Sequence, residues 1–341
     1  MKKPDKTKTT IYDVARASGF STATVSLVMN NDTRIKLSTQ HTVMECVRKL
    51  NYSPSALARG LANQRTYNIG LIIPNLHNPV FAEMVEGVKN YLNNVGYNII
   101  IEVTQQNLEM EKKYLRSVRN QKVDGLIVFP TFLNEIREDL IQIQSEKFPL
   151  IICGVRMDVE SVPMNYVSSN IVEGAYLATE SLIRKGHKKI CLMSGEVNNQ
   201  QSDERIKGYL QALKMYGIPH EEQFILRSSP DLNTVYQKCY EFIGKHPDVT
   251  AFFCLFDYIA MAVFKAIQQR GLRVPQDIAM IGYDDIELDL FMPVELSSVC
   301  TNNYKIGEIS ARIIYDLLQN PDAGVQQIVL PPLLIERESS G

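Results

Sequence analysis

The segment from Thr10 to Ala62 constrains the fold of this 341-residue chain more than any other stretch. Thr10 suits the N-cap of a first helix, and Asp13 stands favourably near the positive N-terminal end of that helix. Gly19 is suited to end this helix, and Ser21 to cap a second helix after a very short turn. Two short helices joined so tightly predict a helix-turn-helix, whose second helix lies in the DNA major groove.

A third helix is expected from about Ser38 to Leu50, because Val43, Val47 and Leu50 recur on one helical face. This face would pack onto the apolar side chains of the first two helices, which are Val14, Val25 and Val28.

Ser53 and Pro54 predict the start of a further short helix, with Ser as N-cap and Pro in the first turn. The helix contains Gly60 and is followed by the polar stretch 63–66. A helix this short is marginal in water, so we expect it to need a partner helix, DNA or both.

The charges are distributed unevenly along the chain. Residues 1–65 hold 11 of the 36 Lys and Arg residues but only 4 of the 38 Asp and Glu residues, although the whole chain has a net charge of -2. A basic N-terminal part on an acidic body is typical of a DNA-binding module joined to another domain. A solvated basic tail is the alternative that charge alone leaves open.

Composition and cysteine spacing exclude several classes of protein. No apolar run is long enough to cross a bilayer, and the Lys-rich N-terminus lacks the apolar segment of a secretory signal. The six cysteines stand singly, without CxxC or metal-type spacing, which favours a reducing cytoplasm and predicts no metal site. No cofactor is predicted.

From Tyr67 onward, apolar strands alternate with amphipathic helices. The expected strands are 69–73, 99–103, 125–129, 150–153, 190–193, 224–226, 251–255 and 278–282, and the expected helices are 80–91, from 108, from 133, 173–184, 205–215, 235–243 and 259–270. This alternation predicts parallel sheets covered by helices on both faces. Two such series imply two doubly wound subdomains, with a ligand cleft beyond the carboxyl ends of the strands.

These features resemble the LacI/GalR family of bacterial transcription repressors, over nearly the whole chain. The matching segments are Ile11–Ala15, Ala23–Ser26, Asn51–Leu61, Ile69–Pro74, Asn78–Phe81, Val123–Leu126, Lys185–Lys188, Arg205–Gly208, Gly271–Pro275, Ile281–Asp284 and Leu330–Ser340. Any one of these is weak evidence, but their number, order and spacing make the resemblance specific.

The resemblance implies an α-helical helix-turn-helix domain (1–52), a hinge helix and linker (53–66), and a ligand-sensing and dimerisation domain (67–341). The sensor would have a periplasmic-binding-protein-like α/β fold of two doubly wound parallel-sheet subdomains, with crossovers near Tyr166, Glu295 and Val325. The N-subdomain would comprise about 67–165 and 296–325, and the C-subdomain about 166–295 and 326–341. Because no leucine heptads follow, a homodimer is expected.

The resemblance also implies which residues contact a pseudo-palindromic operator in double-stranded DNA. They are Thr10, Tyr12, Ser21, Thr22, Ala23, Thr24, Ser26, Leu27, Asn30, Tyr52, Leu57, Arg59 and Leu61. Leu27 stands where the family usually has Arg, so contact with a thymine methyl and an A·T-richer half-site are expected. Alternatively, Leu27 packs inside the three-helix core, and Ser21 is an ordinary cap.

In the hinge, Leu57 and Leu61 stand four residues apart on one helical face. Leu61 aligns with the family's leucine that enters the minor groove and kinks the operator. Leu57 would pack on the partner's hinge, and Arg59 would contact phosphates. Simple packing of both leucines against the sensor is the alternative.

The resemblance places the effector contacts at the cleft. They are Asn75, Asn78, Phe81, Gln201, Arg205, Asp257 and Asp284. Carboxylates, a bidentate Arg and an aromatic face suit a hydroxyl-rich ligand such as a sugar or sugar acid. Alternatively, Arg205 forms a surface ion pair, Asp257 caps a helix and Asp284 lies in a turn.

The sequence therefore predicts a repressor of carbohydrate-utilisation genes whose operator affinity is switched by a small effector. A purine- or nucleoside-responsive repressor and a free-standing sugar-binding protein are the alternatives. An enzyme is disfavoured, because no GxGxxG opens the first sensor helix and neither a Walker loop nor a GxSxG elbow is present.

Overall fold

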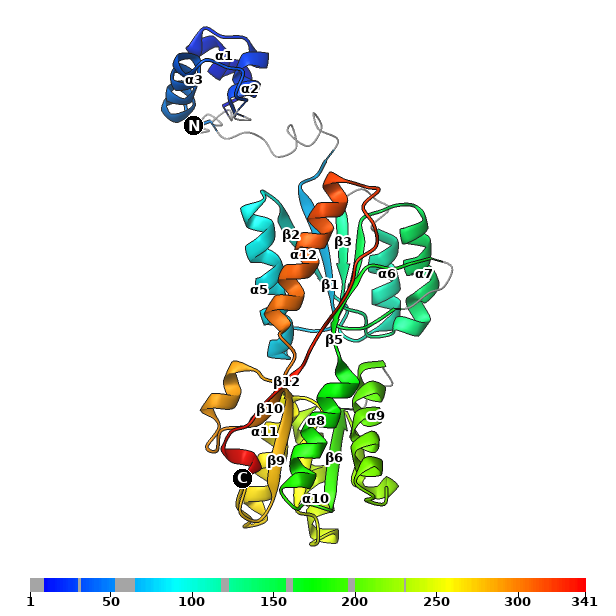
Figure 1. The fold of residues 1–341 in the computed structure, drawn as a ribbon. Coiled ribbons are helices and arrows are strands. Elements are labelled where there is room, and N and C mark those ends of the chain that lie inside the picture. Colours follow the sequence, from blue (N-terminus) through cyan, green and yellow to red (C-terminus); the bar gives the residue numbers. More distant parts are fainter. Residues whose placement is uncertain are drawn as a thin grey trace, which may run out of the picture. The chain divides into compact units, whose positions relative to one another are not determined.

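The computed structural model describes residues 9–29, 32–52, 65–117, 123–157, 162–195, 200–229 and 231–341. The chain divides into two compact units, one up to Thr66 and one from Tyr67 onward (Figure 1). Asn30 and the whole predicted hinge helix, with Leu57, Arg59 and Leu61, lie outside the described residues.

The smaller unit contains the three predicted helices, α1 (Ile11–Ser18), α2 (Thr22–Met29) and α3 (Leu37–Lys49). Gly19 ends α1 with a left-handed φ of 75°, which a residue without a Cβ adopts at little cost. Ser21 caps α2, since its Oγ accepts a hydrogen bond from the Thr24 amide at 3.1 Å. The core is the predicted set of valines, Val14, Val25, Val28, Val43 and Val47.

The larger unit alternates strands and helices as predicted. The elements of the first half are β1 (Asn68–Ile73), α5 (Pro79–Asn94), β2 (Asn98–Val103), α6 (Leu108–Ser117), β3 (Gly125–Val128), α7 (Leu133–Ser145), β4 (Leu150–Cys153), β5 (Tyr166–Ser169) and α8 (Ile171–Arg184). Those of the second half are β6 (Ile190–Gly195), α9 (Gln200–Met215), β7 (Ile225–Ser228), α10 (Leu232–Lys245), β8 (Ala251–Cys254), α11 (Asp257–Gln269), β9 (Ala279–Asp284), β10 (Ser297–Cys300), α12 (Asn303–Gln319), β11 (Gln327–Leu330) and β12 (Leu333–Ile335). Short 3-10 helices cover Glu222–Phe224 (η2), Glu287–Phe291 (η3) and Glu338–Ser340 (η4).

Within the described residues, the strands form two six-stranded sheets. The first has the order β11-β5-β4-β3-β1-β2 and the second β12-β10-β9-β8-β6-β7. Every pair is parallel except β10 with β12, which is antiparallel. We call the halves built on these sheets the first and second subdomain; they meet where the chain passes between them (Figure 1).

Strand pairing places the three crossovers a few residues later than expected. Tyr166–Ser169 pairs with β4 and β11 in the first sheet, and Ser297–Cys300 pairs with β9 in the second. The chain therefore crosses after Ser169, after Cys300 and after Leu330, three to five residues beyond the expected positions near Tyr166, Glu295 and Val325. Apolar patterning does not reveal in which sheet such short strands pair.

Helix α12, which the sequence patterns did not single out, returns to the first subdomain and packs on α5. A Cβ on Gly87 would lie 2.1 Å from the Tyr304 carbonyl oxygen, and one on Gly307 would lie 2.1 Å from that of Met84. The two helices therefore touch backbone to backbone. None of the helices in the described part of the chain is long and apolar enough to span a membrane.

Candidate functional site

The predicted DNA-facing residues of the small unit fall into two groups. Tyr12, Ala23 and Ser26 are exposed, and Thr22 and Leu27 are partly exposed. Leu27 is not among the side chains packed on the valine core, which argues against the core-packing alternative. The exposed face of α2 therefore presents small, uncharged side chains, since no charged residue occurs in this helix.

The remaining described members of the predicted DNA-binding set already have partners inside the unit. The Thr10 hydroxyl donates to the Asp13 carboxylate at 2.7 Å, and the Ser21 and Thr24 hydroxyls are 3.0 Å apart. Tyr52 packs against the valine core. These residues have structural roles whether or not they also touch phosphates.

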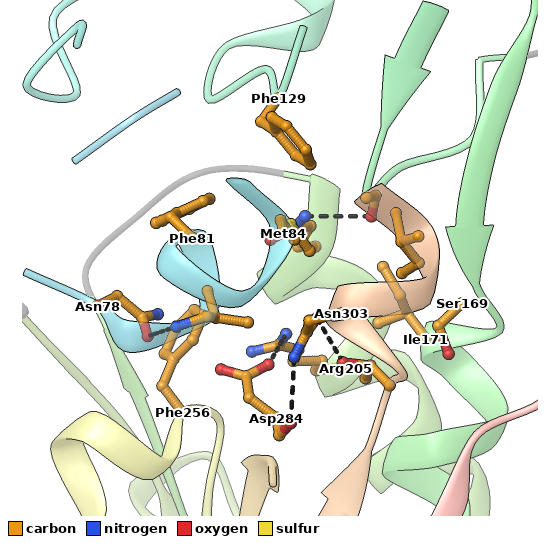
Figure 2. A pocket seen from close by; sticks show the side chains of 15 residues that line it. Asn78, Phe81, Met84, Phe129, Ser169, Ile171, Arg205, Phe256, Asp284 and Asn303 are labelled. Atoms are coloured by element: carbon orange, nitrogen blue, oxygen red, sulfur yellow. Dashed lines mark hydrogen bonds and ion pairs between the residues drawn. The ribbon is translucent and has the colours of Figure 1, made fainter. Parts of the chain in front are cut away.

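A pocket with a cavity volume of about 50 Å³ lies between the two subdomains of the larger unit (Figure 2). Its lining comes from both sheets and from the crossovers. The lining residues are Asn78, Val80, Phe81, Met84, Phe129, Gly154, Ser169, Ile171, Gln201, Arg205, Phe256, Asp284, Thr301, Asn303 and Ile306. Most follow the carboxyl end of a strand or open the next helix, which is where ligands bind in such sheets.

Arg205 and Asp284 form the charged part of the pocket. The Arg205 Nη2 donates to the Asp284 Oδ1 at 3.0 Å, and Nη1 donates to the Leu255 carbonyl oxygen. The guanidinium lies over the rings of Phe256 and Tyr283, 4.4 and 4.0 Å from their centroids. Both charged side chains are at most 5% exposed. A buried pair of opposite charges leaves the pocket with no net charge from these groups.

Burial raises the pKa of Asp284, and the neighbouring Arg205 charge opposes this rise. The backbone of Asp284 is also unusual, because its φ is 117°, in the region that favours glycine. Asn303, at the start of α12, donates from Nδ2 to the Asp284 carbonyl oxygen at 3.2 Å. The end of β9, in the second subdomain, is thus bonded to the first residue of a helix of the first subdomain.

Two polar atoms of the pocket residues have no hydrogen-bond partner among the described residues. They are the Ser169 Oγ, at the end of β5, and the Arg205 Nε. A buried polar atom without a partner is costly, so both are suited to bind a ligand or water. Three aromatic rings complete the lining, and two of them, Phe81 and Phe129, meet edge to face at 75° with centroids 6.3 Å apart.

Five of the seven predicted effector contacts, Asn78, Phe81, Gln201, Arg205 and Asp284, line this pocket. Asn75 does not; it lines the wider cleft that continues outward. Its Oδ1 accepts hydrogen bonds from the amides of His77 and Asn78, both at 3.0 Å.

The expectation for Asp257 is corrected. Its side chain is fully buried and lines neither the pocket nor the outer cleft. It is also not the N-cap of α11, since Phe256 holds that position and Asp257 is the first helical residue. The carboxylate points into the second subdomain, where Ser298 donates a hydrogen bond to it at 2.7 Å.

The sequence reasoning missed several pocket residues. Phe129 directly follows β3 and Phe256 lies two residues after β8, so the rule that ligands bind at carboxyl ends could have found them. Thr301 and Asn303 belong to a crossover whose position depends on strand pairing, and no sequence pattern marks them.

A helix-turn-helix unit joined to a two-sheet binding unit with a pocket between its subdomains defines a ligand-sensing DNA-binding regulator. Comparison with known proteins agrees. Residues 10–55 match the family model for bacterial regulatory proteins of the lacI family, and residues 66–336 match that for periplasmic binding proteins and the sugar binding domain of the LacI family. The chain belongs to the LacI family, whose members repress transcription by binding DNA.

Curated relatives match along nearly their whole length. The HTH-type transcriptional repressor PurR of Photobacterium profundum is 33% identical over 330 residues, covering 97% of this chain and 98% of the relative. The ribose operon repressor of Haemophilus influenzae is 33% identical over 335 residues, with the same coverage. The fold is similar to that of the lac repressor dimer bound to operator and the anti-inducer ONPF, with a TM-score of 0.85 at 23% identity, covering 98% of this chain and 99% of that one.

Proposed function

We propose that this repressor responds to a neutral, hydroxyl-rich effector, which binds between the two subdomains. The observation that carries the proposal is the Arg205–Asp284 pair, buried at the pocket with its charges 3.0 Å apart. Because the pair is internally neutral, an anionic effector would find no unpaired cation there. A neutral ligand does not need an unpaired cation, and it gains charge-assisted hydrogen bonds from the pair.

The other lining residues support a polyol. The amides of Asn78, Gln201 and Asn303 and the hydroxyl of Ser169 can each donate and accept hydrogen bonds, as sugar hydroxyls do. The rings of Phe81 and Phe256 offer apolar surface to the C–H face of a sugar ring.

A purine effector is the second candidate, because curated relatives carry the name PurR. A flat purine base stacks on aromatic faces, and a pair of parallel rings can hold it on both sides. The edge-to-face arrangement of Phe81 and Phe129 offers no such slot, which favours the sugar.

The effector would act through a two-state switch in a homodimer. Ligand would close or tilt one subdomain on the other, change the spacing between the first subdomains of the dimer, and so decide whether the hinge segments pair on a pseudo-palindromic operator. A ligand shifts this balance only by its differential affinity for the two states, typically ~1–3 kcal/mol.

A dimer is supported by an exposed apolar loop on the second subdomain. In η3, Leu288, Leu290 and Phe291 are 45%, 48% and 76% exposed, although monomeric proteins rarely expose such clusters. Sedimentation of the full chain should give twice its mass, and Phe291→Asp should shift it towards the monomer. A wild type that sediments as a monomer at micromolar concentration would contradict the dimer.

In the operator, Thr22, Ala23 and Leu27 on α2 would face base edges and touch thymine methyls, and Ser26 would contact a phosphate. Selection of binding sites from random DNA should then recover half-sites with A·T pairs at these positions. A strict guanine requirement opposite Leu27 would contradict this reading.

The effector proposal is tested by thermal unfolding of the full chain with D-ribose, D-glucose, D-galactose, cellobiose, D-gluconate, adenosine and hypoxanthine. A neutral sugar should stabilise the protein and change its affinity for DNA upstream of its own gene. Asp284→Asn should weaken the binding of that sugar. Asp277→Asn, which alters an exposed ion pair with Arg273, should leave the sugar affinity unchanged. Stabilisation by hypoxanthine and by no sugar would overturn the proposal.

A further inference from the structure

Asp257 is a completely buried carboxylate that the effector pocket does not use. Its Oδ2 accepts hydrogen bonds from the backbone amides of Asp285 at 2.6 Å and Ile286 at 3.3 Å. The Ser298 hydroxyl, on β10, donates to the same carboxylate. All of these donors lie in or beside the turn that follows β9, one residue beyond the effector-binding Asp284.

This turn needs external support. Asp284 and Asp285 have φ values of 117° and 57°, conformations that L-residues adopt only when the surroundings impose them. Arg337 holds the Asp285 side chain through an ion pair at 2.6 Å. Asp257 holds the backbone itself, and a Cβ on Gly282 would lie only 1.8 Å from the Asp257 Oδ1, so no larger residue fits under the carboxylate.

A second buried carboxyl, Asp289, contacts the first. It is 1% exposed and lies in η3, between the exposed Leu288 and Leu290. The Asp289 carboxyl interacts with that of Asp257, and no donor among the described residues reaches the Asp289 Oδ2. Two carboxyl groups can share a hydrogen bond only when one of them carries a proton.

The surrounding donors indicate which carboxyl is charged. Burial raises the pKa of Asp257, and two backbone N–H groups and one hydroxyl oppose this rise by donating to its ionised form. Burial and the neighbouring Asp257 charge raise the pKa of Asp289, with Asp285 adding to the rise and Arg337 opposing it. Asp289 is therefore the neutral donor and Asp257 the charged acceptor.

We propose that Asp257 and Asp289 form a carboxyl pair with one shared proton, which positions the effector-binding turn and ties it to the exposed apolar loop of η3. Neither residue touches the effector; both act through the backbone that carries Asp284. The effector role of Asp284 itself rests on the function proposed above. The pair gives the loop with Leu288, Leu290 and Phe291 a direct mechanical connection to the pocket.

The assigned roles predict unequal effects of two conservative substitutions. Asp289→Asn keeps a donor facing Asp257, so the turn should keep its geometry. Asp257→Asn replaces one acceptor oxygen of the carboxylate by an NH₂ group, which is a donor and cannot accept from the backbone N–H groups. The turn after β9 should therefore lose these hydrogen bonds and open more often. Hydrogen exchange of the full chain without effector, at one pH, should be at least tenfold faster for the amides of Asp285 and Ile286 in Asp257→Asn. The exchange rate of these amides in Asp289→Asn, and in the exposed control Asp277→Asn, should match that of the wild type.

Equally faster exchange in both variants, or unchanged exchange in Asp257→Asn, would contradict the proposed carboxyl pair. If Asp257→Asn does not fold, wild type and Asp289→Asn are compared by unfolding between about pH 5 and pH 8. The wild-type folded state keeps a proton that its unfolded chain releases, so its folding constant should fall tenfold more per pH unit than that of Asp289→Asn. Parallel pH curves would overturn the proposal.

The outcome does not depend on the identity of the effector. If no sugar stabilised the protein but hydrogen exchange followed the expected pattern, the proposed function would be wrong and the carboxyl pair would be supported. The pair would fail alone if D-ribose or another sugar of the panel bound, Asp284→Asn abolished that binding, and Asp257→Asn left both exchange and sugar affinity unchanged.

Discussion

The two compact units of the molecule place their charges differently. In the small unit, ion pairs such as Arg34–Asp32 and Lys49–Glu45 lie at the surface, and the five buried core residues are all valines. The larger unit buries Arg205, Asp284, Asp257, Asp289 and Glu111. Surface charges give affinity for a polyanion that salt can screen, whereas buried charges give stereospecific hydrogen bonds at a cost in stability. Each unit thus has the electrostatics that its ligand requires.

The two units should differ most in the unfolding free energy that is lost when the Arg of an ion pair is removed from each. Arg205→Ala leaves Asp284 buried without its cation, so the sensor should lose about 3–5 kcal/mol of unfolding free energy. Arg34→Ala, in the exposed pair of the small unit, should change stability too little to measure. Chemical denaturation of the full chain, followed by a probe in each unit, measures both. Similar losses in the two variants would show that the Arg205 pair is hydrated.

Glu111 gives a smaller effect that depends on pH. Its Oε1 accepts from the Thr131 amide at 3.0 Å, while its Oε2 is buried without a partner among the described residues. Burial raises the pKa of this carboxyl to about 7 from 4.5. The folded state therefore keeps a proton that the unfolded chain releases, so the contribution of Glu111 to stability is largest below about pH 4.5 and is lost as the pH rises to about 7.

Glu111→Gln keeps an acceptor for the Thr131 amide and removes the titration. Between pH 5 and pH 8 the wild type should lose ~1–3 kcal/mol relative to this variant, measured by urea unfolding at each pH. Glu138→Gln, at an exposed position of helix α7, is the matched control and should follow the wild type. A wild-type curve as flat as that of Glu111→Gln would mean that Glu111 is ionised in the fold.

The two units also differ in how far the sequence predicts them. In the small unit the decisive signals, Gly19 and Ser21, act on their own neighbours, so helices and core were predicted together. In the sensor, apolar runs predicted strands and helices, and the family resemblance identified Arg205 and Asp284.

The features that the sequence did not predict are set by packing between residues that are remote in the sequence. Asp257 follows a strand just as a ligand contact would, but its direction is set by Gly282 and Ser298, which are remote in the sequence. Asn303 reaches the pocket because the chain crosses there after β10. Neither fact has a local signature.

The smallest effect separates the two binding reactions by their response to salt. Raising salt from about 50 to 200 mM should weaken operator binding at least about tenfold, because phosphate contacts release counterions. Over the same range, the affinity for the stabilising sugar should change less than about twofold, since Arg205 and Asp284 are shielded from solvent. Filter binding and calorimetry on the same preparation measure the two slopes. A sugar affinity that falls as steeply as operator affinity would place the effector at the surface and remove the contrast between the units.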